Sequence, residues 1–172
     1  MKKSLLAIFL LLFLSSPIAF AITEGKNIDV TPEMIKEYQD VTLSFNVIRA
    51  LEMLKDTTGS YSREAILGKN LTNRPVKIEF LNLATINPIY SNFDALGWKK
   101  KKDLYIYINE KHKDAPIEAL SAILAHEAIH QDEYNSLNEE TYAWTLEAAV
   151  WTQLTEENPA LEKISHPLVE RE

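Results

Sequence analysis

The chain has 172 residues, of which 46% are hydrophobic and 25% are charged, and its formal net charge at pH 7 is −7. This acidic balance argues against a nucleic-acid partner, because phosphate contacts require clustered Lys and Arg. The sequence contains no cysteine. Disulfides, a lipid-modified cysteine and thiolate metal ligands are therefore excluded, which leaves His, Asp and Glu to hold any metal ion.

The first 21 residues have the three parts of a secretory signal peptide. Lys2 and Lys3 precede an apolar run from Leu5 to Leu14, and the Ala-Phe-Ala stretch at 19–21 places small residues at the cleavage positions. The apolar run is shorter than the about 20 residues that span a bilayer. We therefore expect residues 1–21 to be removed, leaving a secreted or periplasmic protein with no stable membrane span. An uncleaved N-terminal anchor is the alternative.

Residues 22–172 are predicted to form one domain, since no linker, repeat or low-complexity block divides them. The Thr-Pro pair at 31–32 is typical of a helix start. Apolar residues then recur at helical spacing from Met34 to Leu54, which predicts one long amphipathic helix. A shorter helix is expected around Arg63 to Leu67, ending at Gly68.

The middle of the chain changes to strand patterns. Apolar and charged residues alternate from Val76 to Phe80, and the stretch from Leu104 to Ile108 is rich in β-branched and aromatic residues. Between them, Ile89-Tyr90 is a candidate hairpin partner, and the lysines at 99–102 are expected in a solvated turn. From Pro116 onward the pattern returns to helix. This order of elements predicts an α+β fold.

The segment His126-Glu127-Ala128-Ile129-His130 has the HExxH pattern. Histidines four residues apart lie on one face of a helix and can bind one zinc ion, with Glu127 as the general base that deprotonates a zinc-bound water. Two histidines can also occur on a helix by chance. However, residues 117–125 are apolar almost all round, so this helix should be buried. Buried polar groups need partners, and a metal ion provides one for all three side chains.

A catalytic zinc ion needs a third protein ligand and an open position for water. Ser136 and Glu139 form a capping box, which assigns Glu139 to the start of a helix and leaves Glu140 as the expected ligand. Glu147, two turns further along the same face, is a rival ligand or a partner of a ligating histidine. His166 is the remaining alternative, if the tail folds back.

Four other residues are weaker candidates. Tyr134 and Tyr142 flank the motif, and either is placed to stabilise an oxyanion or simply to pack. Asp132 is expected at a helix end, with a supporting role for a ligand as the alternative. His112 is expected on the surface.

The motif at 126–130, followed by a helix reading Glu140-x-x-Ala143, resembles the gluzincin branch of the zincin metallopeptidases. The resemblance implies a zincin-like fold of one compact domain, in which a small mixed sheet lies beside the active-site helix. It implies a zinc-dependent peptidase with His126, His130 and Glu140 as ligands. The chain departs from the family pattern at Trp144, where many members have an aspartate that orients a ligating histidine. The metzincin pattern fails, because no glycine or third histidine follows at the required spacing.

In zincins an edge strand commonly pairs with the backbone of a peptide or protein substrate, and residues 104–108 are the candidate for this strand. Two other function classes fit the same residues. One is a non-catalytic exported metal-binding or interaction domain, and the other is a zinc hydrolase that does not act on peptides.

Overall fold

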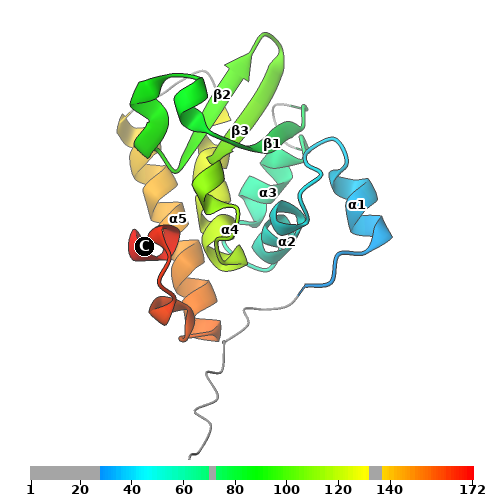
Figure 1. Ribbon diagram of the computed structural model, residues 1–172. Helices are drawn as coiled ribbons and strands as arrows, with labels where there is room; N and C mark the ends of the chain where they lie inside the picture. The colour runs from blue at the N-terminus through cyan, green and yellow to red at the C-terminus, as the bar shows by residue number, and fades with distance from the viewer. Residues whose placement is uncertain (1–27, 70–72, 132–136) are drawn as a thin grey trace, which may run out of the picture.

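The computed structural model describes residues 28–69, 73–131 and 137–172 (Figure 1). The predicted signal peptide at 1–21 lies outside these ranges, as do Asp132, Tyr134 and the predicted cap Ser136. The helices are α1 (Pro32–Tyr38), α2 (Phe45–Leu54), α3 (Ser60–Ile66), α4 (Ile117–Glu127), α5 (Leu137–Glu157) and α6 (Pro167–Glu170). Short 3-10 helices are η1 (Leu83–Thr85), η2 (Pro88–Asn92), η3 (Glu110–His112), η4 (Ala128–Gln131) and η5 (Leu161–Lys163).

The fold is α+β, as the sequence predicts. Its strands β1 (Val76–Leu81), β2 (Ala95–Lys100) and β3 (Asp103–Asn109) form one mixed sheet in the order β1-β3-β2. Strand β1 is parallel to β3, and β2 is antiparallel to it. The central strand is therefore β3, so the expectation that residues 104–108 form an edge strand is wrong. The edge on the side of the motif is β2, which contacts both α4 and η4.

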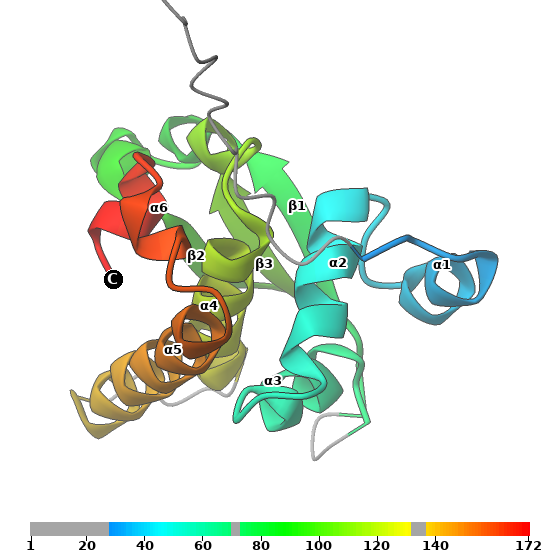
Figure 2. The same cartoon turned by 90° about the horizontal axis from the view of Figure 1, so that it is seen from below.

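Helix α4 runs through the middle of the molecule, with α5 on one side and α2 on the other (Figures 1 and 2). Every residue from Glu118 to Glu127 is buried, which confirms the prediction from its apolar sequence. Two serine hydroxyls fix the helix to its neighbours. Ser121 Oγ donates to the carbonyl of Ala50 (2.9 Å), and Ser62 Oγ donates to the carbonyl of Ala125 (3.0 Å). These two hydrogen bonds hold α4, whose C-terminal end carries the start of the motif, against α2 and α3.

The expected long helix over 34–54 is two helices, α1 and α2. Polar residues between them form local hydrogen bonds that compete with a continuous helix. Thr42 Oγ1 accepts from the Ser44 N–H (3.1 Å), and Ser44 Oγ caps α2 by accepting from the Val47 N–H (3.5 Å). The break also lets the Val41 carbonyl accept from Ile78 in β1 (2.8 Å).

The expected strand at Ile89-Tyr90 is also wrong, because these residues lie in η2. Asn87 caps this 3-10 helix through its side-chain oxygen, which accepts from the Ile89 N–H (3.1 Å), and Pro88 follows at the first helical position. The partner of β3 in the hairpin is β2 instead. Lys101 and Lys102 form the exposed turn between them, and Lys99 and Lys100 are the exposed last residues of β2. The predicted solvated turn at 99–102 is therefore confirmed for its last two lysines.

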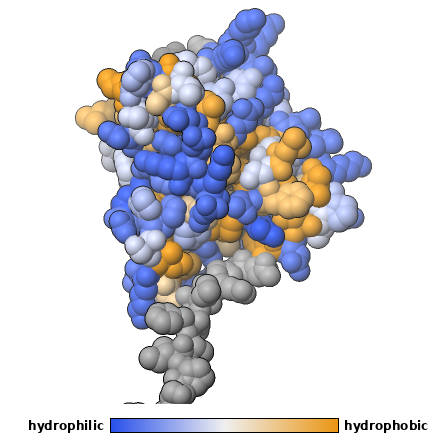
Figure 3. Space-filling model, in the orientation of Figure 1, coloured by the Kyte–Doolittle hydropathy of each residue, from blue (hydrophilic) through white to orange (hydrophobic). Residues whose placement is uncertain are grey.

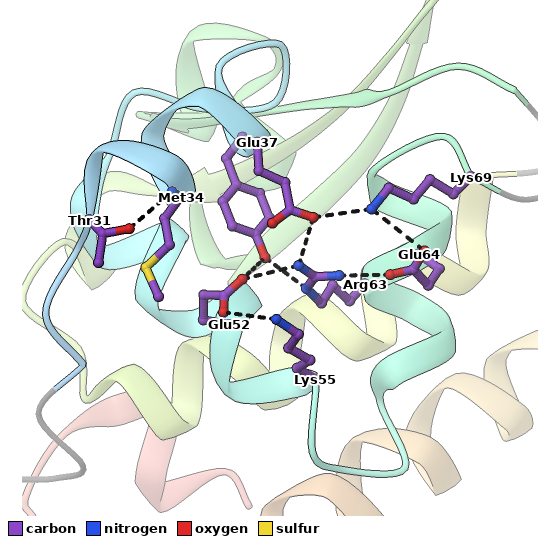
Figure 4. A network of polar contacts seen from close by, with 9 residues as sticks. Thr31, Met34, Glu37, Glu52, Lys55, Arg63, Glu64 and Lys69 are labelled. Atoms are coloured by element: carbon purple, nitrogen blue, oxygen red, sulfur yellow. Dashed lines mark hydrogen bonds and ion pairs between the residues drawn. The ribbon is translucent and has the colours of Figure 1, made fainter.

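A buried arginine joins the first three helices (Figure 4). The side chain of Arg63 on α3 is 4% exposed and forms ion pairs with Glu37 of α1 and Glu52 of α2, both at 3.0 Å. Its Nε also donates to the hydroxyl of Tyr38 (2.7 Å). A buried guanidinium needs such partners, and these contacts set the position of α3 against α1 and α2.

Among the described residues, no helix is both long and apolar enough to cross a bilayer. Figure 3 shows apolar side chains gathered over the part of one face that α1 and α2 occupy. Ile35, Leu43 and Phe45 are exposed in this region. The rest of this face is mainly hydrophilic.

Candidate metal centre

The motif lies where α4 changes into a tighter helix. Helix α4 ends at Glu127, and η4 carries His130, whose φ of −81° and ψ of 19° depart from helical values. The two histidines therefore do not lie on one regular α-helix, contrary to the prediction from their spacing. Their rings nevertheless meet, with centroids 5.0 Å apart and Nε2 atoms 3.2 Å apart.

Three side chains converge on one point. Glu140, in the first turn of α5, places Oε1 3.5 Å from Nε2 of His130 and Oε2 3.9 Å from Nε2 of His126. His126, His130 and Glu140 are a group whose ligand atoms all lie within 4.8 Å of one another and which can hold a metal ion. These are the three residues that the sequence predicts as ligands.

The other nitrogen of each histidine faces a carboxylate. Nδ1 of His130 lies 2.8 Å from Oε1 of Glu139, and Nδ1 of His126 lies 2.7 Å from Oε2 of Glu147. The second contact is at ion-pair distance but is not aligned as a hydrogen bond. The assignment of Glu139 to the helix cap alone is therefore wrong, since its carboxylate also contacts His130. Glu147 lies on the Nδ1 side of His126, which makes it an orienting partner rather than a ligand.

The contacts with Glu139 and Glu147 bear on which ring nitrogen of each histidine carries its hydrogen. An ionised carboxylate only accepts hydrogen bonds, so Nδ1 of His130 carries the hydrogen in its contact with Glu139, and Nε2 of His130 then presents a lone pair. Where Nε2 of His126 also presents a lone pair, the two nitrogens 3.2 Å apart repel each other unless a cation lies between them. Ligand atoms about 2.0–2.1 Å from a tetrahedral zinc ion lie about 3.3 Å from one another. The two Nε2 atoms are 3.2 Å apart, and Oε1 and Oε2 of Glu140 lie 3.5 Å from His130 Nε2 and 3.9 Å from His126 Nε2, respectively, which is near this separation.

Glu127, the predicted general base, lies against the same site. It is 8% exposed, and burial raises the pKa of its carboxyl, while His126 and His130 act in the opposite direction. A hydrogen bond from the backbone of Gly97 in β2 also lowers this pKa, although less than burial raises it. Glu127 is thus a better proton acceptor than an ordinary surface glutamate.

A cavity of about 490 Å³ opens at these residues. It is lined by residues of β2 and the segment before it, by the motif and by the helices that follow: Phe93, Asp94, Ala95, Leu96, Gly97, His126, Glu127, His130, Glu140, Trp144 and Arg171. The Asn109 N–H donates to the carbonyl of Asp94 (2.8 Å), and hydrogen-bonded pairs alternate along an antiparallel ladder. The backbone groups of Ala95 and Gly97 therefore point away from β3, toward the outer edge of the sheet.

Asp94 and Arg171 also line the site, although no sequence motif points to them. Arg171 NH1 lies 3.3 Å from Oδ2 of Asp94, and its NH2 lies 2.7 Å from Oε1 of Glu147. Burial alone would raise the pKa of Asp94, but its hydrogen bond with His112 and its ion pairs with Lys111 and Arg171 hold that pKa well below the ordinary value. Arg171 follows Asp94 by 77 residues, so no local pattern connects the two.

The remaining candidates lie elsewhere or serve the structure. His112 is fully buried and contacts Asp94 at 2.7 Å, so the prediction of a surface position is wrong. His166 caps α6, where Nδ1 accepts from the Leu168 N–H (3.1 Å), and it is not part of the cluster. Tyr142 is 71% exposed and does not line the cavity. Trp144 instead packs its ring edge-to-face with His126, with centroids 4.9 Å apart.

Comparisons with protein-family models, with curated proteins and with solved structures gave no significant match.

Proposed function

We propose that this chain is an exported zinc-dependent peptidase with a zincin-like fold, in which His126, His130 and Glu140 bind the metal and Glu127 is the general base. The observation that carries the proposal is the convergence of the two Nε2 atoms and the Glu140 carboxylate in one cavity with Glu127. The carboxylate beside each Nδ1 supports zinc, because the other nitrogen of a ligating histidine commonly faces such a group.

The chemistry divides between the metal and the protein. A bound zinc ion would lower the pKa of a coordinated water, toward about 7, and would polarise a carbonyl group. Glu127 would accept the proton of the attacking water at its carboxylate and deliver it to the leaving nitrogen. Its burial supports this role, since a raised pKa suits both the acceptance and the later release of the proton.

Strand β2 supports a peptide as the substrate. Its outer edge carries the outward backbone groups of Ala95 and the outward carbonyl of Gly97, whose N–H already donates to Glu127, and both residues line the cavity. An extended peptide can add to such an edge through main-chain hydrogen bonds. This assigns substrate binding to β2 in place of the strand at 104–108, which is already paired on both sides.

The test combines zinc content with peptide cleavage in the native chain and a Glu127→Gln variant. We expect both proteins to bind close to one zinc ion, and the variant to lose cleavage by a factor of about 10²–10⁴, the contribution typical of a general base. Glu157→Gln, at the exposed end of α5, is the matched control and should keep both properties. Zinc binding without cleavage of any peptide in a mixed library would instead favour a non-catalytic metal-binding domain. Cleavage that survives in Glu127→Gln would remove the assigned base.

A further inference from the structure

Glu147 is the most deeply buried carboxylate of the site. Its side chain is 1% exposed, and it lies on α5 directly behind His126. Oε2 lies 2.7 Å from Nδ1 of His126 and accepts a hydrogen bond from Arg171 NH2 at 3.0 Å. The same oxygen thus contacts both the histidine and the guanidinium. The guanidinium also reaches the other carboxylate oxygen, since NH2 of Arg171 lies 2.7 Å from Oε1 of Glu147.

Arg171 is itself held on two further sides. Its NH1 lies 3.3 Å from Oδ2 of Asp94, and its guanidinium carbon lies 4.7 Å from the ring centroid of Trp144. Trp144, which lies one turn before Glu147 on α5, packs edge-to-face with His126. Arg171 therefore reaches His126 by two routes, one through a carboxylate and one through an aromatic ring.

We propose that Arg171 is a positioning residue of the metal site: it holds the Glu147 carboxylate against Nδ1 of His126, and so fixes the ring whose Nε2 faces the metal. This inference rests on the proposed metal site. It explains how the site functions with Trp144 at the position where an orienting aspartate would stand in the family pattern. Glu147, one helical turn further on, takes that orienting role, and Arg171 supplies the charge that holds it in place.

The design fits the chemistry of the two side chains. An arginine fork can contact two carboxylates in fixed directions, whereas a lysine offers a single point charge on a flexible stem. The contacts with Asp94 and Glu147 use different terminal nitrogens of the guanidinium. Charge alone is therefore not sufficient, and the geometry of the fork is part of the role.

The experiment measures zinc affinity of the full chain by competition with a chelator, for Arg171→Ala, Arg171→Lys, Glu147→Gln and the double variant Glu147→Gln/Arg171→Ala. Arg171→Ala should bind zinc about 10–100-fold more weakly, the loss typical of a removed orienting partner. Arg171→Lys should recover only part of this loss. Because Arg171 acts through Glu147, the double variant should bind no more weakly than Glu147→Gln alone. Lys163→Ala, an exposed cation in the same C-terminal region, is the control and should bind as the native chain does.

Two further readouts separate positioning from general stability. Added guanidinium ion should restore zinc affinity in Arg171→Ala, and the absorption bands of bound Co²⁺ should shift in that variant and return on rescue. If Arg171→Ala binds zinc like the native chain, or if the losses of the two single variants multiply in the double variant, the proposal is wrong while the metal site stands. If the native chain itself binds no zinc, the metal site and this inference both fail.

Discussion

Glu139 provides the sharpest test of the site, because the sequence and the structure assign it different roles. A residue that only caps α5 should not affect zinc binding, whereas a carboxylate 2.8 Å from Nδ1 of His130 should. The Glu139 side chain is 11% exposed and that of His130 is 14% exposed, so solvent screens their contact only in part. Loss of such a partner costs about 10–100-fold in metal affinity, or about 1.4–2.7 kcal/mol.

Two substitutions divide this cost. Glu139→Gln keeps an oxygen that can accept from Nδ1 and removes only the charge, so we expect a loss of zinc affinity near the lower bound, about tenfold. Glu139→Ala removes the acceptor as well, and the loss should approach about 100-fold. Chelator competition on the folded proteins measures both, with Glu157→Gln as the control on the same helix. Thermal unfolding of the zinc-free proteins reports the capping role separately, at about 0.5–2 kcal/mol. Unchanged zinc affinity in both Glu139 variants would refute the assignment and leave the cap as its only role.

Three other predictions concern the third ligand, acid stability and export. Glu140→Gln should weaken zinc binding sharply in the same competition assay, because a neutral amide is a poor zinc ligand, whereas His166→Ala should leave zinc affinity unchanged. A large loss in His166→Ala with no loss in Glu140→Gln would make His166 the third ligand. Asp94→Asn should lower the free energy of unfolding of the zinc-free protein by about 1–3 kcal/mol near neutral pH. The folded-state pKa of Asp94 is lowered, so its contribution to stability is present above the unfolded-state pKa of about 3.9 and is lost as the pH falls toward the folded-state pKa. The stabilities of the two proteins measured by urea titration should therefore converge in acid. A difference that stays constant with pH would contradict the assignment. N-terminal sequencing of exported protein should begin at Ile22, whereas a chain that keeps Met1 would indicate an anchor.

The sequence predicts well what depends on local composition. Residues 117–125 are apolar apart from Glu118 and Ser121, and such a helix has no wide polar face to turn toward solvent, so its burial follows directly. The strand alternation from Val76 and the turn at the lysines of 99–102 are equally local. The break before Phe45 escapes the hydrophobic pattern, because hydroxyl groups at Thr42 and Ser44 decide it through hydrogen bonds that leave the apolar spacing intact.

The partners of the ligands are harder to predict, because they depend on how helices pack. Glu139, Glu140 and Glu147 all lie on α5, and only the rotation of α5 against α4 decides which of them faces Nε2 and which faces Nδ1. Arg171 is beyond any periodic argument, since its contacts bridge elements far apart in the chain. The sequence thus predicts the ligands from the spacing of a motif, but it does not predict the residues that hold them.

The long sequence separation between Asp94 and Arg171 has a consequence for how the protein matures. The site draws on β2, α4, α5 and the residue after α6, so a chain still being synthesised lacks one wall of the cavity until residue 171 has been added. Metal ions bind tightly only to a formed site, and binding then adds to stability by mass action. The elements that carry Asp94 and Arg171 should therefore have come together before the site can hold a metal ion.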